Sequence, residues 1–336
     1  MPSNIKGVPL ADLERQMAEI GHPAYRARQL FRWVNQKRVN DFSQMSDLSR
    51  KFQAECAERF ALPTVEVAQK RESDDGTAKW VVVLGDGHRV ESVYIPAEER
   101  RTLCVSTQVG CKMSCQFCAT GHGRFKRNLQ AWEIVEQLFV APVPVTNIVL
   151  MGMGEPFDNY DEVMKALSIF SHPYGPQIGK RHITVSTVGI SNKIEAFLAA
   201  DIAKLAISLH GTTDETRSQI MPINRKFPLS ELMDLCRRLQ MRSGLRLTFE
   251  YVLLAGINDS DDDARRLVQL VKGIACKINL LAYNENLFVD IKRPSEERVM
   301  SFQRILLDSY LTVTYRRSRG RDIAAACGQL TTSRLA

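Results

Sequence analysis

Residues 103–121 read LCVSTQVGCKMSCQFCATG and place three cysteines, spaced Cys-x3-Cys-x2-Cys, directly after a short apolar run. The apolar run, residues 103–106, is typical of a buried β-strand. From this point onward apolar runs alternate with helical patterns, which predicts a parallel sheet whose strands are joined by helices. Six or so such units in series indicate an α/β fold with a barrel or partial barrel. We predict a partial (βα)6 barrel.

The alternation defines the expected elements of this region. Strands are expected over residues 103–106, 147–151, 182–186, 203–208, 247–253, 276–281 and 311–315. Helices are expected near residues 130–141, 158–170, 190–199, 228–242, 260–272 and 295–309. We therefore assign residues 98–336 to the barrel and a C-terminal tail. Ligands in such folds bind beyond the carboxyl ends of the strands, so functional residues should follow successive strands.

The residues before the barrel have two other patterns. Apolar residues recur at helical spacing in residues 10–20, 25–34 and 48–60, which predicts a small helical domain over residues 1–62. Residues 63–97 instead contain three short β-branched or aromatic runs separated by the turn sequences DDGT and GDGH. This second segment is expected to form an antiparallel β-meander that extends the barrel.

Composition limits the classes of protein that this chain can belong to. Lys and Arg total 45 against 38 Asp and Glu, and the resulting net charge of +7 fits an acidic partner without requiring one. No apolar run approaches the roughly 18 residues of a membrane helix. The N-terminal sequence lacks the regions of a secretion signal. We therefore expect a cytoplasmic location, where eight reduced cysteines indicate metal or redox chemistry.

The cysteine triplet Cys111, Cys115 and Cys118 is the strongest chemical signal in the chain. Its tight spacing lets one loop wrap a metal centre, and soft thiolates favour iron–sulfur or zinc. A structural zinc site would need a fourth ligand with paired spacing, and the sequence has no second Cys-x-x-Cys. We therefore predict a 4Fe–4S cluster that leaves one iron open for a small molecule. Zinc and plain buried thiols are the alternatives.

Small polar residues follow the later strands, as the strand-end argument requires. The sequence MGMGEP at residues 151–156 has glycines that let a backbone approach a ligand and a carboxylate that can accept from an ammonium group. Each of the residues concerned is, taken alone, more often a turn or capping residue. Together they suit a ribose and an adenine. The candidates are Gly154, Glu155, Ser186, Ser208, Leu209, His210 and Asn284.

Two further cysteines stand apart from the triplet. Cys104 lies in the first barrel strand, and Cys327 lies in the arginine-rich C-terminal stretch. The simplest interpretation is that both are small buried hydrophobic residues, as we infer for Cys56, Cys236 and Cys276. The arginines near Cys327 would favour a thiolate, but this argument does not separate the two interpretations.

The triplet in a strand–helix barrel resembles the radical S-adenosylmethionine (SAM) superfamily, in which the open iron binds SAM. The wider set of motifs resembles one of its families, the RlmN-type RNA methyltransferases, over nearly the whole chain. The motifs are LCVSTQVGCKMSCQFCATG, ESVYIP, MGMGEP, ITVSTVGI, AISLH, MPIN and AACGQL.

This resemblance implies a role for each candidate residue. Cys111, Cys115 and Cys118 match the cluster ligands, and the seven strand-end residues named above match the SAM contacts. Cys327 matches a cysteine that becomes methylated, and Cys104 matches its resolving partner. Glu91, in ESVYIP, matches the general base, although a single Glu on a hairpin strand would otherwise be interpreted as solvated surface.

The resemblance also implies the reaction. Carbon 2 of an adenosine is methylated in 23S ribosomal RNA, at the peptidyl-transferase centre, and in transfer RNA, next to the anticodon. Two SAM molecules are consumed per methylation: one methylates Cys327, and the other activates that methyl group. Cys104 then releases the product and forms a disulfide with Cys327. The implied electron donor is a flavodoxin or ferredoxin, and the enzyme is expected to be a monomer.

Charge supports an RNA substrate. Residues 101–130 contain five basic and no acidic residues, and residues 311–336 contain five arginines and one Asp. Their sum exceeds the net charge of the whole chain, so positive charge gathers beside the candidate cysteines, as phosphate contacts would require. A solvated basic face is the alternative. The slightly basic residues 1–62 are our candidate for binding folded RNA.

Two other functions remain open from the sequence. The carbon-8 branch of the family, the Cfr-like enzymes, shares the cysteine set and the barrel. An iron–sulfur protein that binds RNA or transfers electrons without methyl transfer would not need Cys104, Cys327 or Glu91. Residues 285–294 also lack the proline- and glycine-rich run that is common at this point in the family.

Overall fold

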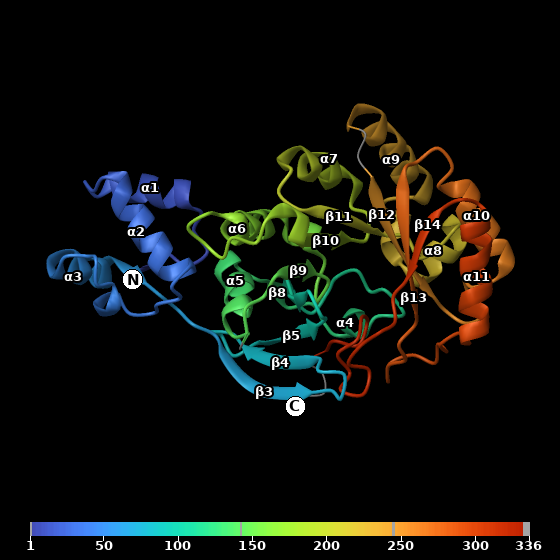
Figure 1. The fold of residues 1–336 in the computed structure, drawn as a ribbon, viewed down its shortest axis with the longest axis horizontal. Helices are drawn as coiled ribbons and strands as arrows, with labels where there is room; N and C mark the ends of the chain where they lie inside the picture. Colours follow the sequence, from blue (N-terminus) through green and yellow to red (C-terminus); the bar gives the residue numbers. More distant parts are fainter. Residues whose placement is uncertain (1, 142, 244–245, 332–336) are drawn as a thin grey trace.

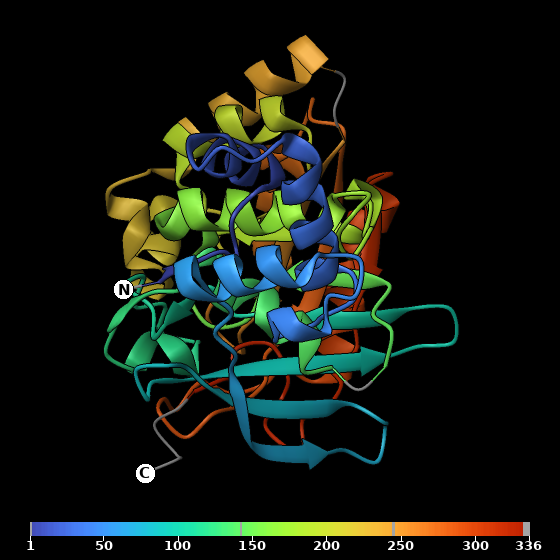
Figure 2. The same ribbon diagram turned by 90° about the vertical axis from the view of Figure 1, so that its left-hand side faces the viewer.

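The computed structural model describes residues 2–141, 143–243 and 246–331. Three helices form the N-terminal domain, as predicted: α1 (Leu10–Glu19), α2 (Ala24–Asn35) and α3 (Arg50–Arg59). A proline precedes each of the first two helices. At a helix start its fixed φ is compatible with the turn, and its missing N–H removes no hydrogen bond within the helix. The N-terminal helices stand at one end of the elongated molecule, seen from the side in Figure 1 and end-on in Figure 2.

A buried ion pair joins the N-terminal domain to the rest of the chain. The strands β1 (Ser3–Asn4) and β2 (Phe60–Ala61) pair in parallel and bring the two ends of the domain together. Directly after β1, the Lys6 ammonium lies 2.7 Å from a carboxylate oxygen of Glu136, and both side chains are at most 5% exposed. Gly7 follows with a φ of +76°, and a Cβ there would lie 2.3 Å from the Trp132 backbone nitrogen.

We expect Lys6→Met to destabilise the protein strongly. The change leaves Glu136 as an unpaired charge in the interior, which typically costs about 3–5 kcal/mol. The denaturant midpoint for unfolding measures the effect. Lys165→Met is the matched control, because Lys165 pairs with Glu162 at the surface, where such pairs contribute about 0–1 kcal/mol. Equal midpoints for the two variants would contradict this prediction.

One ten-stranded sheet organises the remainder of the chain, in the order β14-β13-β12-β11-β10-β9-β6-β5-β4-β3. The seven strands from β14 to β6 are parallel. They are β6 (Arg101–Cys104), β9 (Asn147–Leu150), β10 (Ile183–Thr187), β11 (Lys204–Ser208), β12 (Leu247–Leu253), β13 (Cys276–Ala282) and β14 (Thr312–Tyr315). Since β14 and β3 are both edges, the sheet is open, which confirms a partial rather than a closed barrel.

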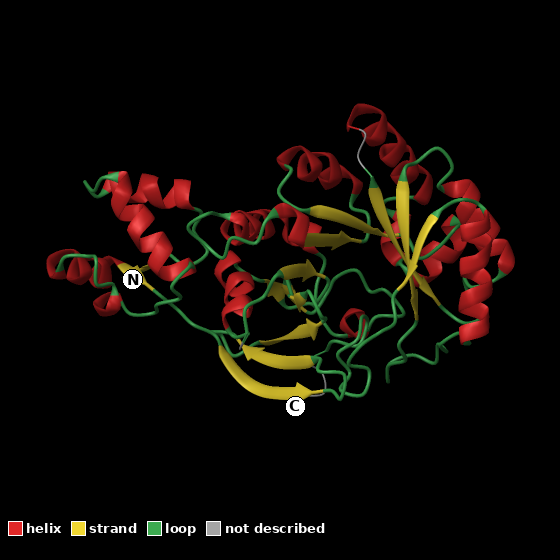
Figure 3. Cartoon of the chain, viewed as in Figure 1, coloured by secondary structure: helices red, strands yellow, loops and turns green. Residues whose placement is uncertain are grey.

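The helices between these strands lie along the outside of the curved sheet (Figure 3). They are α5 (Ala131–Phe139), α6 (Tyr160–Ser171), α7 (Ser191–Ala200), α8 (Asp214–Ile220), α9 (Leu229–Ser243), α10 (Asp261–Leu270) and α11 (Glu296–Asp308). Six were predicted to within a few residues, whereas α8 was not. The seven-residue α8 is capped by Thr213, and its one fully buried charged side chain, Arg217, breaks the apolar pattern.

Short elements complete the fold. They are α4 (Ala119–His122), β7 (Gln108–Val109), β8 (Arg127–Asn128) and the 3-10 turns Phe42–Gln44, Pro156–Asn159, Lys180–His182 and Pro222–Arg225. These segments are too short to leave a periodic signal in the sequence, so none of them was predicted. Two of them, β7 and α4, flank the cysteine triplet and therefore set the path of its loop.

The predicted meander is present but is continuous with the barrel sheet. Its strands are β3 (Glu66–Glu72), β4 (Ala78–Val83) and β5 (Arg89–Pro96), and they pair antiparallel in that order. The last of them, β5, also pairs antiparallel with the first barrel strand, β6, with Val93 opposite Cys104. The segment that carries Glu91 is thus held rigidly against the segment that carries Cys104.

Candidate active site

A cavity of about 180 Å³ lies beyond the carboxyl ends of the parallel strands, where the fold predicts a ligand site. Residues after β9, β10 and β11 contribute to its wall, as do residues of the cysteine loop and of the C-terminal tail. Of the sequence candidates, Cys111, Cys115, Cys118, Gly154, Glu155, Ser186, Ser208, His210 and Cys327 line the cavity.

The cysteine triplet forms a tight loop between β7 and α4. Ser114 adopts a left-handed φ of 53°, and a Cβ on Gly121 would lie 2.9 Å from the Cys115 carbonyl oxygen. Glycine is therefore required where the loop closes on itself. The loop also bonds to a neighbour: the Gln116 amide donates to the Ile220 carbonyl at 2.9 Å. The thiols are consequently fixed around the cavity rather than carried on a free segment.

These three thiols are ligands of the kind that an iron–sulfur cluster takes. Burial, and then the neighbouring Cys118 sulfur, raises the pKa of Cys115, so the sulfurs are close enough to repel one another as thiolates. Yet no three His, Cys, Asp or Glu side chains in the described residues are gathered as a single metal ion would require. A 4Fe–4S cluster takes each thiolate on a different iron, so it suits thiols that surround a cavity.

Glu155 lies at the cavity wall, where its carboxylate accepts three hydrogen bonds from the protein. It accepts from the Thr187 hydroxyl at 2.6 Å, from the Val188 amide at 2.9 Å and from the Phe157 amide at 3.0 Å. Burial raises the pKa of Glu155 to about 7, although these hydrogen bonds act in the opposite direction. A cationic ligand group beside Glu155 would favour the ionised form. Gly154 lets the chain pass, since a Cβ there would lie 2.5 Å from Gln108.

The ends of β10 and β11 present hydroxyl and imidazole groups to the cavity. The Ser186 and Ser208 oxygens are 3.4 Å apart. The Val252 amide donates to Nδ1 of His210 at 3.1 Å, and burial lowers the pKa of His210 to about 3, so the ring is neutral. Leu209 does not reach the cavity wall: its side chain is fully buried, and its backbone amide pairs with the Glu250 carbonyl at 3.0 Å.

The C-terminal tail places Cys327 in this same cavity. Nδ2 of Asn284, just after β13, donates to the Cys327 carbonyl at 3.1 Å, so this candidate holds the tail rather than lining the cavity. The Ala119 amide donates to the Gly328 carbonyl at 2.7 Å. Cys327 is exposed and lines the same cavity as the triplet. Burial raises the Cys327 pKa, and Arg316 lowers it by less.

Cys104 lies in β6 and is 7% exposed. Burial raises the pKa of Cys104 to about 12, and a Cys327 thiolate raises it further, so the two sulfurs lie within electrostatic range of each other. The disulfide that the resemblance implied is absent: all eight cysteines are free thiols.

Glu91 is 2% exposed, so the interpretation as solvated surface is wrong. Its carboxylate lies 2.8 Å from the Lys79 ammonium and accepts from the Thr331 amide at 2.8 Å. It lines a separate cavity of about 170 Å³, between the meander and the C-terminal tail. The tail therefore separates Glu91 from the triplet in this conformation.

Sequence reasoning missed two charged groups, Arg217 and Glu250, whereas it had noted the arginines near Cys327. Arg217, on α8, donates to the carbonyls of Val188, Ser208 and Leu209 and so ties together the ends of two strands. Glu250 and Arg316 line the cavity near Cys327. A carboxylate inside the apolar strand sequence LTFEYVL was a signal for Glu250, because an isolated charge in a buried strand needs a partner or a function. Its partner is Asn279, at 2.8 Å.

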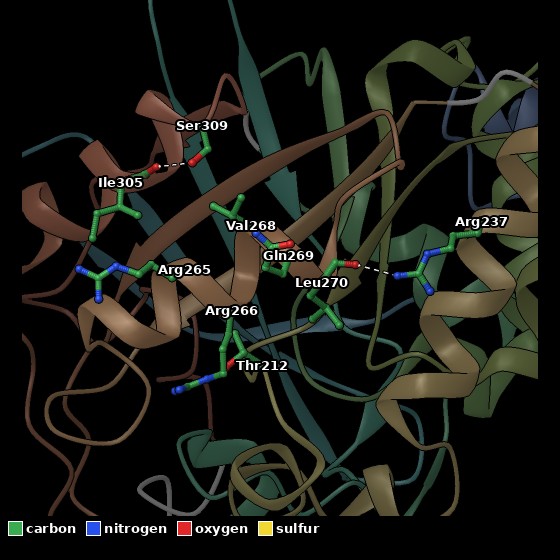
Figure 4. Close-up of a pocket in the computed structure, with 9 residues that line it drawn as sticks. All are labelled: Thr212, Arg237, Arg265, Arg266, Val268, Gln269, Leu270, Ile305 and Ser309. Atoms are coloured by element: carbon green, nitrogen blue, oxygen red, sulfur yellow. Dashed lines mark hydrogen bonds between the residues drawn. The ribbon is translucent and has the colours of Figure 1, made fainter.

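A larger cavity, of about 640 Å³, lies elsewhere, between α9, α10 and α11 (Figure 4). Its arginines Arg237, Arg265 and Arg266 each pair with an aspartate on their own helix, three residues earlier. The groove thus lacks uncompensated arginine charge and contains none of the candidate residues. The smaller cavity at the strand ends is the one that contains the candidate residues.

Comparison with known proteins first identifies the superfamily to which the chain belongs. Residues 105–268 match the model of the radical SAM superfamily, and the crystal structure of a radical SAM methyltransferase from Sphaerobacter thermophilus superposes with a TM-score of 0.93. That structure is 41% identical, and the match covers 99% of this chain and 100% of the other. Residues 3–62 match a second model, the ribosomal RNA large subunit methyltransferase N-terminal domain.

Curated relatives then give the family. The dual-specificity RNA methyltransferase RlmN of Geobacter sulfurreducens is 47% identical, with 97% of this chain and 91% of the relative covered. The RlmN of an Anaeromyxobacter species is 46% identical, with 97% and 90% covered. The chain belongs to the RlmN family of dual-specificity RNA methyltransferases. It is accordingly a radical SAM enzyme that acts on RNA with a 4Fe–4S cluster and SAM.

Across the described ranges, every helix is too short or too polar to cross a bilayer.

Proposed function

We propose that this enzyme methylates carbon 2 of an adenosine in 23S ribosomal RNA, at the peptidyl-transferase centre, and of the adenosine next to the anticodon in transfer RNA. The methyl group would pass through Cys327. The observation that carries the proposal is the arrangement of thiols: Cys327 opens into the same cavity as the triplet, and Cys104 lies within electrostatic range of it. Neither an iron–sulfur RNA-binding protein nor an electron carrier has a use for two additional thiols at this place.

The residues at the strand ends fit the cofactors. Cys111, Cys115 and Cys118 would hold the cluster, and the Glu155 carboxylate would receive the amino group of SAM. Ser186, Ser208 and His210 offer hydrogen-bonding groups for its ribose and adenine, while Leu209 would contribute only through its backbone. The bound cluster supplies one electron that divides SAM homolytically, so that a hydrogen atom can be removed from a methyl group on Cys327.

The protein's own groups would perform the other steps. The Cys327 thiolate takes a methyl group from one SAM by displacement. After a second SAM has removed one hydrogen atom from that group, its carbon radical bonds to carbon 2 of the adenine. The adduct then gives up its unpaired electron, which the bound cluster would accept back, and Glu91 takes the ring proton. The Cys104 thiolate then attacks the Cys327 sulfur, the sulfur–carbon bond breaks, and the carbon takes a proton to become the RNA methyl group. An external reductant restores the two thiols. Two SAM molecules are thus used per methylation.

We also propose a division of roles along the chain. Residues 1–62 bind folded RNA, residues 63–97 supply Glu91, and residues 98–336 contain the barrel and the tail with Cys327. Arginines and lysines near the cavity would contact RNA phosphates. The target base must leave its stack to reach Cys327. We expect a monomer that receives electrons from a flavodoxin or ferredoxin.

Anaerobic incubation with SAM, a reductant and either RNA tests the proposal. Nucleoside analysis of both products should show 2-methyladenosine. A product methylated at carbon 8 would instead place the enzyme in the Cfr-like branch, and unmodified RNA from protein with a full cluster would contradict methyl transfer. Peptide mass spectrometry of the purified protein should show a methyl group on Cys327.

A further inference from the structure

Lys79 is a buried charge that the reaction outlined above leaves without a role. It lies on β4, and its side chain is 8% exposed. Register places Val81 opposite Glu91 on the antiparallel strand β5, so Lys79 and Glu91 are diagonal neighbours on one face of the sheet. Their charged groups are 2.8 Å apart. A lysine is seldom buried without a partner, and here the partner is the proposed base.

The same ammonium also contacts the tail. It donates to the Ala324 carbonyl at 3.0 Å, three residues before Cys327. On the other side of Cys327, the Thr331 amide donates to the second oxygen of Glu91. Ala324 has a left-handed φ of 52°, which a residue with a Cβ adopts only when its surroundings hold it there. The Lys79–Glu91 ion pair therefore holds the tail by one hydrogen bond on each side of Cys327.

We propose that Lys79 is a positioning residue that keeps Glu91 ionised, so that the carboxylate can remove the ring proton once the tail no longer separates it from the cavity with Cys327. This inference rests on the proposed function, because it assumes that Glu91 is the base. Lys79 itself touches neither the RNA base nor the cofactors in this scheme. It acts through Glu91.

The charges around Glu91 support this role. Burial raises the pKa of Glu91, while Lys79 lowers it most strongly, followed by the Thr331 hydrogen bond and the more distant Arg71 on β3. Lys79 and Arg71 are the charged side chains that face Glu91 across its cavity. Without Lys79 the opposing effect of burial dominates, so the pKa of Glu91 rises further. A smaller fraction of the base is then ionised at neutral pH, and the deficit shrinks as pH rises.

The experiment compares Lys79→Met with Lys79→Arg and with Lys70→Met as a matched control. Lys70 lies on the adjacent strand β3 in an exposed pair with Glu72. Single-turnover methylation of RNA is measured between pH 6 and about 9, the range over which a raised carboxyl pKa would titrate, with enzyme already methylated on Cys327. At pH 7 Lys79→Met should be slower by about tenfold or more, since one opposite charge typically shifts a carboxyl pKa by about 1–3. The pH below which the methylation rate of Lys79→Met declines should be higher than for the wild type. Lys79→Arg should recover to within about threefold, because it retains the charge, and Lys70→Met should match the wild type.

Three readouts separate this role from a merely structural one. Circular dichroism and iron content establish that each variant is folded and loaded. Methylation of Cys327 itself should be largely retained in Lys79→Met, because that step needs no Glu91 and the tail keeps its backbone contacts with Asn284 and Ala119. In a Glu91→Gln background, adding Lys79→Met should lower the single-turnover rate of RNA methylation by less than about threefold, because the effect on Glu91 is already lost. If Lys79→Met folds poorly, Lys79→Gln replaces it in each measurement.

Several results would overturn the inference. A pH profile of Lys79→Met parallel to that of the wild type would show that Lys79 does not control Glu91, as would equal losses with and without Glu91. A loss of Cys327 methylation in Lys79→Met would show that Lys79 acts on the tail alone. Wild-type enzyme that leaves RNA unmethylated would instead overturn the proposed function, and this result is visible before any variant is compared.

Discussion

Cys327→Ala is expected to abolish RNA methylation, with a loss on the order of 10⁴-fold or more, because the atom that would carry the methyl group is removed. The side chain opens into the cavity, and the tail is held through its backbone by Asn284 and by the Ala119 amide. The variant should therefore fold normally. It should retain about four irons per chain, as a 4Fe–4S cluster requires. It should also still bind SAM.

Radioactive methyl transfer from SAM to RNA measures this effect, and iron analysis accompanies it. Cys236→Ala is the control, because Cys236 is also a free cysteine but is buried in α9, outside the cavity. The control should methylate RNA at close to the wild-type rate. Methyl transfer by Cys327→Ala within about tenfold of the wild type would exclude a methyl-cysteine intermediate, because loss of an obligatory nucleophile costs far more than that.

Cys104→Ala is expected to produce the second large effect, which is a covalent complex between RNA and protein. Cys104 is buried within electrostatic range of Cys327, so without its sulfur nothing is placed to break the bond between Cys327 and the methylated base. Multiple turnover should fall by about 10³-fold or more, a loss typical of removing a reacting thiol. A slowly migrating band, sensitive to both protease and nuclease, should accumulate with SAM and reductant.

The double variant Cys104→Ala with Cys327→Ala is the control for the complex, and it should form none. Mass spectrometry of the digested complex should place the nucleotide on Cys327. Rapid release of methylated RNA by Cys104→Ala would refute the resolving role. Accumulation of the complex on any other residue would refute the role of Cys327 instead.

Much of the barrel could be predicted because its strands are buried on both faces. Such strands form continuous apolar runs, and residues 247–253 were placed without error. The register between strands was beyond prediction, because sequence periodicity does not report which residues lie opposite one another. The pairing of Val93 with Cys104, which brings the proposed base and the resolving thiol onto neighbouring strands, emerges only from the fold.

Some site residues could be predicted and others could not, because the sequence reports local motifs but not long-range contacts. The triplet is a local signal, and its thiols do share one cavity. Residues such as Lys79 and Arg217 lie in ordinary amphipathic or polar surroundings in the sequence, and only long-range contacts bury them. Lys79 donates a hydrogen bond to the carbonyl of Ala324, which lies 245 residues further along the chain. The placement of Asn284 and Leu209 away from the cavity wall was equally invisible, because a strand end fixes a backbone position but not the direction of a side chain.

The contacts between the meander and the tail also determine when the enzyme can become active. Lys79 and Glu91 leave the ribosome early, whereas their partners at Ala324 and Thr331 are translated more than 200 residues later. Under the proposed mechanism, Cys327 is translated only after the meander and the parallel strands. Methyl transfer to RNA therefore begins only once residues 324–331 have been translated and have docked on the meander.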